Sequence, residues 1–181
     1  MIREIASALP GFVTVDGERY FNLRRGIRFG MTPDEVVRIE RMAGFGYRSP
    51  KLLDNWEIYD FGHKYHLTFE AQRETVGGLK CWCFEYNFTK DTQLLYQFSY
   101  GFGGQNSAVY FPLLQAMEMK YGPADPSAES SEYYSGQEEV FHRNHLCWNF
   151  QEDGEHFVAV DLWLDIVNNC CLVYERKSRR S

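Results

Sequence analysis

Residues 79–100 read LKCWCFEYNFTKDTQLLYQFSY, and this stretch decides the fold class. Large apolar side chains recur at every second position of two runs, 79–88 and 93–100, which is the period of a β-strand. They are Trp82, Phe84, Tyr86 and Phe88 in the first run, and Leu94, Tyr96, Phe98 and Tyr100 in the second. Cysteines and polar residues fill most of the alternate positions, so the pattern predicts an antiparallel sheet with one face packed on helices and one face open.

Further strand patterns flank this stretch on both sides. Asp16-Gly17 separates two short runs near the N-terminus, Phe12–Val15 and Glu18–Leu23, and this dipeptide favours a two-residue type I′ hairpin. We expect the remaining strands at Trp56–Phe61, Tyr65–Glu70, Gln137–Phe141, Asn144–Gln151, His156–Leu164 and Asn169–Arg176.

Helix patterns divide the strands into two groups. We expect a short helix at 2–9, a second from Pro33 to about Met42 and a third from near Tyr110 to Tyr121. Thr32 and Glu35 form a capping box before the second helix, and Gly44 and Gly46 follow it. Pro112 fits best as an early residue of the third helix.

The order of these elements predicts an α+β fold built from two tandem helix-plus-antiparallel-sheet units. One continuous sheet with helices on one face is the other arrangement that fits. The expected boundaries are 1–30 for an N-terminal helix and hairpin, 31–104 for the first unit and 105–181 for the second, all in one compact structure.

Composition narrows the class of function. The 181 residues carry a net charge of −6, which disfavours nucleic acid as a partner because phosphate binding needs a basic face. No run of residues is apolar enough for a signal peptide or a membrane span. The five cysteines are irregularly spaced, as expected for reduced thiols, and together these features predict a cytoplasmic protein.

The start of the second helix resembles a known group of proteins. Residues 27–36, IRFGMTPDEV, resemble the helix opening of SmpA-type outer-membrane assembly lipoproteins and of folds similar to the β-lactamase inhibitor protein. Residues 120–123, KYGP, resemble the helix ending common in the same group. The resemblance implies helices packed on an antiparallel sheet that serves as a protein-binding surface. The chain has neither the lipobox of the lipoproteins nor the disulfides of the inhibitor, so their particular roles do not carry over.

Four side chains form a candidate metal site. Cys81 and Cys83 lie two apart on one expected strand, and His145 and Cys147 are spaced in the same way on another. If the two strands were neighbours, these four ligands would converge tetrahedrally, as zinc prefers. The alternative is that the thiols are half-buried and act as small apolar side chains, with no cofactor.

The expected strand 156–164 carries the candidate binding residues. Phe157, Ala159, Asp161 and Trp163 alternate with its core valines and leucines, so that an open sheet face would expose two aromatic rings beside an acid. Burial of both faces of this strand is the alternative. No motif for a catalytic nucleophile or a phosphate loop is complete, and no catalytic residue is assigned.

Two functions follow from these observations. The first is a non-enzymatic protein-binding module, of the kind found in cytosolic immunity or inhibitor proteins, with a partner that is another protein and basic. The second is a small-ligand or metal-binding protein, or an enzyme, that uses the Cys/His face or a pocket between the units. The sequence does not indicate an oligomeric state.

Overall fold

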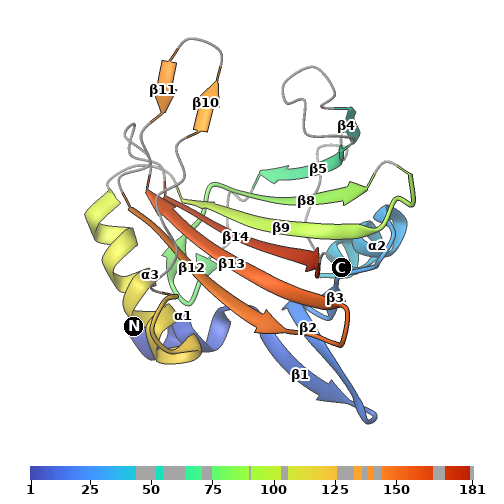
Figure 1. Cartoon of the computed structure of the whole chain (residues 1–181), viewed down its shortest axis with the longest axis horizontal. Helices are drawn as coiled ribbons and strands as arrows, with labels where there is room; N and C mark the ends of the chain where they lie inside the picture. The colour runs from blue at the N-terminus through green and yellow to red at the C-terminus, as the bar shows by residue number, and fades with distance from the viewer. Residues whose placement is uncertain are drawn as a thin grey trace.

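The computed structural model describes residues 1–43, 52–54, 64–70, 75–89, 91–102, 106–125, 133–135, 138–140, 144–164 and 170–179. Its described part is an α+β fold in which helices pack on antiparallel strands, as expected (Figure 1). The strand expected at 56–61 and the glycines expected to end the second helix lie outside the described residues.

The described residues form three helices. They are α1 (Ile2–Ala8), α2 (Pro33–Met42) and α3 (Asn106–Tyr121). The capping box of α2 is present, because the Thr32 hydroxyl accepts a bond from the Glu35 backbone N–H and the Glu35 carboxylate accepts one from the Thr32 N–H. The third helix begins four residues earlier than expected, at Asn106, so Pro112 lies inside it. Its buried side chains at Tyr110, Leu113, Ala116 and Met117 hold this helix on the core and outweigh the local preference of proline.

Seven strands form one continuous antiparallel sheet in the order β12-β13-β14-β9-β8-β5-β4. The strands expected in the two units meet where β14 pairs with β9, near the middle of the sheet (Figure 1). Their bounds are β4 Leu52–Asp54, β5 Lys64–Glu70, β8 Cys83–Thr89, β9 Leu95–Phe102, β12 Asn144–Gln151, β13 His156–Leu164 and β14 Cys170–Ser178.

Three small sheets complete the described strands. They are β1 (Gly11–Val15) with β2 (Glu18–Arg24) and β3 (Ile27–Arg28), β6 (Thr75–Val76) with β7 (Leu79–Lys80), and β10 (Tyr133–Ser135) with β11 (Glu138–Val140). In the first sheet, Val15 pairs with Glu18 across Asp16-Gly17. Both turn residues have positive φ, 51° and 85°, as a type I′ turn requires, which confirms the predicted hairpin.

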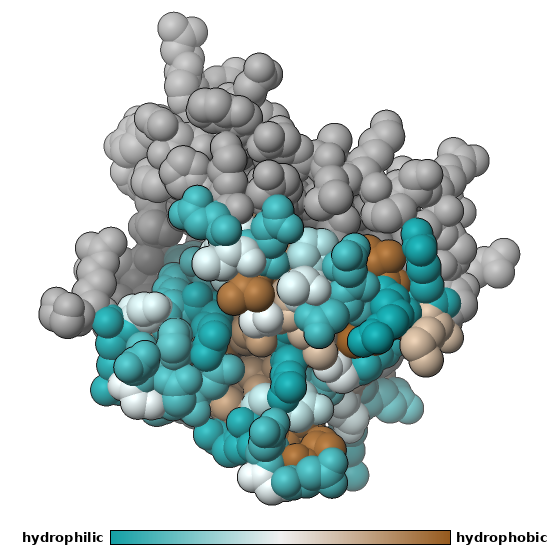
Figure 2. Space-filling model, turned by 90° about the vertical axis from the view of Figure 1, so that its right-hand side faces the viewer, coloured by the Kyte–Doolittle hydropathy of each residue, from teal (hydrophilic) through white to brown (hydrophobic). Residues whose placement is uncertain are grey.

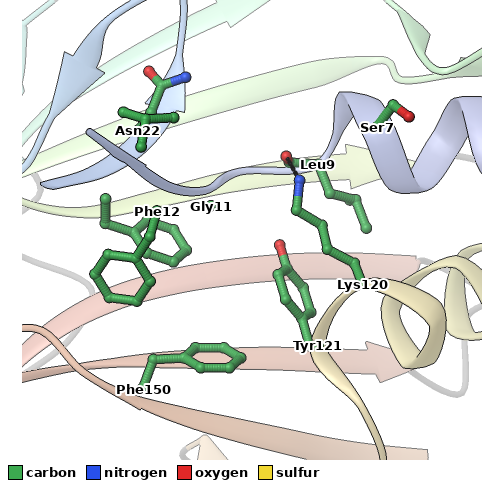
Figure 3. A pocket seen from close by; sticks show the side chains of 10 residues that line it. Ser7, Leu9, Gly11, Phe12, Asn22, Lys120, Tyr121 and Phe150 are labelled. Carbon is green, nitrogen blue, oxygen red and sulfur yellow. Dashed lines mark hydrogen bonds between the residues drawn. The ribbon is translucent and has the colours of Figure 1, made fainter. Parts of the chain in front are cut away.

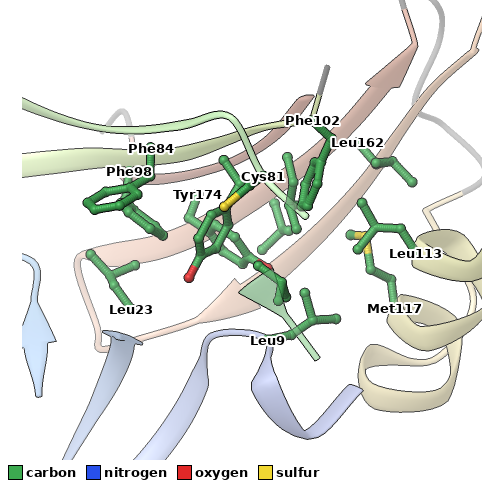
Figure 4. Close-up of a cluster of buried hydrophobic side chains, with 14 of the residues drawn as sticks. Leu9, Leu23, Cys81, Phe84, Phe98, Phe102, Leu113, Met117, Leu162 and Tyr174 are labelled. Atoms are coloured by element: carbon green, nitrogen blue, oxygen red, sulfur yellow. The ribbon is translucent and has the colours of Figure 1, made fainter. Parts of the chain in front are cut away.

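One face of the large sheet, here called the inner face, carries the hydrophobic core. Phe84, Tyr86, Phe98 and Tyr174 belong to this face and are almost fully buried. All three helices and the β1–β2–β3 sheet add buried side chains to the same cluster, some of which Figure 4 shows beside Tyr174. The helices therefore pack on one side of the sheet, as the alternating pattern predicts.

The strand expected at 79–88 is broken at Cys81 and Trp82, and this changes the position of these two residues. Lys80 ends β7, the chain bends at Trp82, and β8 begins only at Cys83. Cys81 consequently lies in the core, where Figure 4 shows it, rather than on the open face. Trp82, which the alternation assigned to the core, is 59% exposed.

A second irregularity shifts the pattern in β9. Asn87 pairs with Gln97 but the next residue, Phe88, pairs with Leu95, so Tyr96 is an extra residue on β9. Such a bulge reverses the alternation on one side of it. Leu95 is therefore buried with Phe98, whereas Leu94, predicted on the apolar face, is 39% exposed.

A buried carboxylate fastens α2 to the sheet. Glu40 is fully buried, with its Oε1 2.9 Å from Arg24 Nε and its Oε2 3.0 Å from Arg25 Nη1. The Tyr86 hydroxyl donates to Glu40 Oε1 over 2.5 Å, and burial together with the Glu40 charge raises the Tyr86 pKa well above its usual value. This network joins α2, β2 and β8.

Candidate functional site on the outer face of the sheet

The side of the large sheet away from the helices, here called the outer face, contains the predicted binding residues. Two rows of side chains cross it, and the strand register defines them. The first row is His145, Trp163, Cys171, Gly101 and Cys83, and the second is Cys147, Asp161, Val173, Ser99 and Glu85. Residues of the large core cluster come from the alternate positions of the same strands.

The three predicted binding residues are half-buried. They are therefore neither fully exposed, as an open sheet face would make them, nor fully buried, as the alternative required. Phe157, Asp161 and Trp163 retain partial exposure, while Ala159 between them is 1% exposed. Asp161 and Trp163 lie in adjacent rows. Phe157 lies four residues from Asp161, about 13 Å along the strand, and faces Lys177 of β14.

An ion-pair geometry on the outer face was not predicted from sequence. His145 Nε2 lies 2.8 Å from Asp161 Oδ1, and both side chains are less than one fifth exposed. The two residues are not directly opposite, because His145 faces Trp163 and Asp161 faces Cys147. Period-two alternation assigned both residues to one face, but only the register of β12 against β13 brings them together.

The four predicted metal ligands do not converge, and this prediction is wrong for the structure. Cys83 on β8 and the pair His145 and Cys147 on β12 are separated by β9, β14 and β13, about 19 Å across the sheet. Cys81 is in the core on the opposite side. Among the described residues, no group of three or more His, Cys, Asp and Glu side chains is arranged to hold a metal ion.

Two cysteines of the outer face are poor nucleophiles. Burial, with smaller contributions from Glu85, Cys171 and Cys81, raises the pKa of the Cys83 thiol to about 12. Burial also raises the pKa of Cys147 to about 12, and the neighbouring Asp161 carboxylate adds to the effect. Since the thiolate is the reactive form, neither group has the chemistry of a catalytic cysteine at neutral pH.

Trp82 is an aromatic residue of the outer face, although the sequence pattern assigned it to the core. A Cβ atom placed on Gly101 would lie 2.8 Å from Trp82 Nε1 and 2.7 Å from Cys83 Sγ. Glycine at 101 therefore gives Trp82 room to lie over the backbone of β9. In the first row, Cys171 and Gly101 are neighbours. The Trp163 indole lies next to Cys171, and the Trp82 indole lies next to Gly101.

One side of the molecule is polar over its described residues. The side of the molecule that Figure 2 shows is mostly hydrophilic, and its apolar residues form small separate areas. Scattered apolar side chains are normal for a protein surface and indicate no additional interface. In the described part of the chain, no helix is long and apolar enough to cross a membrane.

Comparisons of the chain with protein-family models, curated proteins and solved structures gave no match. The resemblance of residues 27–36 to SmpA-type proteins and to the β-lactamase inhibitor group therefore stays a prediction.

Proposed function

We propose that this protein is a non-enzymatic protein-binding module whose contact surface is the outer face of the sheet. The proposal rests on Trp163 and Asp161, two neighbouring, partly exposed side chains on the sheet face opposite the helices. A tryptophan next to a carboxylate that is already held in place by His145 is a combination typical of binding hot spots. The hydrogen bond from His145 fixes the carboxylate before binding, which lowers the conformational entropy lost on association.

Charge favours a basic partner. The chain has a net charge of −6, and Asp161, Glu85 and Glu175 lie in or next to the second row of the outer face. Lys177 lies 3.5 Å from Glu175 and offsets part of this charge. A basic partner would meet such a surface faster at low ionic strength.

The narrower class is an immunity or inhibitor-type protein that acts in the cytoplasm on a basic toxin or enzyme. Unreactive thiols support a binding role over catalysis at this face, because Cys83 and Cys147 both have raised pKa values. The resemblance of the α2 start to proteins that use a sheet as a binding surface supports the same class.

The proposal is tested by measuring how a captured partner responds to substitutions on the outer face. The tagged protein would be used to isolate a partner from lysate of its own host, and its affinity then measured by calorimetry. We expect Trp163→Ala or Asp161→Asn to weaken binding at least tenfold, about 1.4 kcal/mol or more.

Matched controls lie on the helix side of the molecule. Phe111 is 58% exposed on α3, and Phe111→Ala removes an exposed aromatic ring without touching the sheet. Glu118→Gln, also on α3, removes one negative charge in the same way as Asp161→Asn. Equal affinity of the outer-face variants and these controls, with all variants folded by circular dichroism, would reject the proposal.

A further inference from the structure

A pocket of about 370 Å³ opens on the helix side of the molecule, away from the outer face. It lies where the α1–β1 junction, β2, the end of α3 and β12 meet (Figure 3). The pocket therefore joins the N-terminal segment to the last third of the chain. Its volume is near the lower end of the range for small-molecule sites.

The walls of the pocket are aromatic. Phe12, Phe21, Tyr121 and Phe150 line it, and Figure 3 shows Phe12, Tyr121 and Phe150 around the same space. The ring centroids of Phe12 and Phe150 are 6.5 Å apart with the rings nearly perpendicular, and those of Tyr121 and Phe150 are 5.2 Å apart. A flat ring bound in this space could pack against the edge of one lining ring and the face of another.

One cation, Lys120, lines the pocket, and a second, Arg19, lies with its Cζ 3.7 Å from the centre of the Phe12 ring. The Lys120 ammonium donates to the Leu9 carbonyl oxygen, and its side chain reaches past Gly11, where a Cβ atom would be 3.0 Å from Lys120 Cε. Within the described ranges, no carboxylate forms an ion pair with Lys120. The Lys120 side chain as a whole is exposed, and the partial burial of its end lowers the pKa of the ammonium.

The Tyr121 hydroxyl, at the same end of the pocket, already has protein partners. The Tyr121 hydroxyl donates to the Pro10 carbonyl oxygen over 2.6 Å and lies 3.2 Å from the Tyr174 hydroxyl. These bonds hold the Tyr121 ring as a fixed wall. Lys120, with three N–H groups and one carbonyl acceptor, is the group that has donors to offer.

We propose that this pocket binds a small planar aromatic carboxylate, with its ring between Phe12, Phe150 and Tyr121 and its carboxylate on the Lys120 ammonium. The one ammonium in the pocket lining matches the single charge of a carboxylate better than the double charge of a phosphate dianion. The aromatic walls favour a flat ring over an aliphatic chain, because ring pairs gain contact energy beyond buried area. This site is independent of the protein-binding function proposed above.

The probe is indole-3-acetate, with the neutral indole-3-acetamide as its matched ligand. Binding to the full chain is followed by ¹H–¹⁵N NMR, which reports both affinity and location. For a ligand of this size we expect a dissociation constant of about 0.1–1 mM for the carboxylate. The shifted amides should be those of Gly11, Phe12, Tyr121 and Phe150.

Two lysine variants separate the charge effect from a general loss of structure. Lys120→Met keeps the apolar stem but removes the ammonium, and should weaken indole-3-acetate about fivefold to tenfold while leaving indole-3-acetamide unchanged. Lys80→Met removes one exposed lysine outside the pocket and should change neither affinity.

Three results would overturn the proposal: no shift at a concentration about tenfold above the expected range, shifts confined to residues outside the pocket, or equal binding of the carboxylate by wild type and Lys120→Met. A Lys120→Met protein that fails to fold is replaced by Phe12→Leu, which shrinks one wall and should weaken both ligands. Unchanged binding to Phe12→Leu would likewise overturn it. None of these outcomes affects the outer-face test, which uses different residues and a protein ligand.

Discussion

The buried Glu40 network gives the sharpest prediction of stability. Glu40 is fully buried, and Arg24, whose guanidinium pairs with it, is only 7% exposed. Glu40→Ala removes the carboxylate and leaves the Arg24 charge in the protein interior, where it cannot regain its hydration. Breaking a buried pair in this way costs about 3–5 kcal/mol of unfolding free energy. The Tyr86 hydroxyl loses its hydrogen bond to Glu40 at the same time, which adds to the expected loss.

The assay is urea unfolding followed by circular dichroism and tryptophan fluorescence. For a chain of this length, each kcal/mol corresponds to about 2–4 °C in melting temperature, so a scanning measurement should show a decrease of roughly 6–20 °C. Glu118→Ala is the matched control, because it truncates an exposed helical glutamate and should change stability by less than about 0.5 kcal/mol.

A double-mutant cycle isolates one contact of the network. Tyr86→Phe alone should cost about 1.5–3 kcal/mol, because it removes a hydrogen bond to a charged group. In the Glu40→Gln background the same change should cost less, since the acceptor is then neutral. A total loss below about 1 kcal/mol for Glu40→Ala would refute the reasoning that this carboxylate holds α2 on the sheet.

Three further predictions concern backbone, thiol and carboxyl groups. Gly77→Ala should lower the free energy of unfolding by about 1–3 kcal/mol more than Gly78→Ala, although both glycines have positive φ. The reason is that a Cβ atom at 77 would lie 2.3 Å from the α1 backbone, whereas a Cβ atom at 78 would meet open space. Equal unfolding midpoints in urea would contradict this. Cys83 and Cys147, with pKa values near 12, should react with a disulfide reagent at pH 8 about tenfold or more slowly than free cysteine, and a rate equal to free cysteine would show that they are not buried as described. Asp153 should titrate near pH 2 by carboxyl ¹³C NMR, because the backbone N–H of Glu155 donates to its carboxylate. Since its pKa is depressed in the folded state, its contribution to stability is present above the ordinary pKa of 3.8 and is lost as the pH falls toward 2. A titration midpoint near 4 would argue against this hydrogen bond.

Elements decided by neighbouring residues were predictable from sequence. The Asp16-Gly17 turn and the Thr32 capping box form as expected, because each depends on the backbone geometry and hydrogen bonds of a few consecutive residues. The bounds of β12 and β13 agree with the prediction at both ends. The α+β class with helices on one sheet face follows from the same local alternation.

Local alternation failed where pairing with a distant strand imposed an irregularity. Trp82 and Cys81 exchanged sides because the chain bends between β7 and β8, where the Trp82 N–H donates to the Gly101 carbonyl oxygen. Leu94 and Leu95 exchanged roles at the β8–β9 bulge. Each break involves a residue outside the local segment: Trp82 bonds Gly101, about twenty residues later, and Leu95 exchanges backbone hydrogen bonds with Gly30 and Met31.

Alternation within single strands predicted most of the side chains that face the core, and the net charge of −6 follows from composition alone. Only the tertiary structure decided that β14 pairs with β9, that His145 meets Asp161, and that Cys83 lies far from Cys147. The physical reason is that side-chain alternation depends on the geometry of a single strand, whereas the order and register of strands depend on packing between segments distant in the chain.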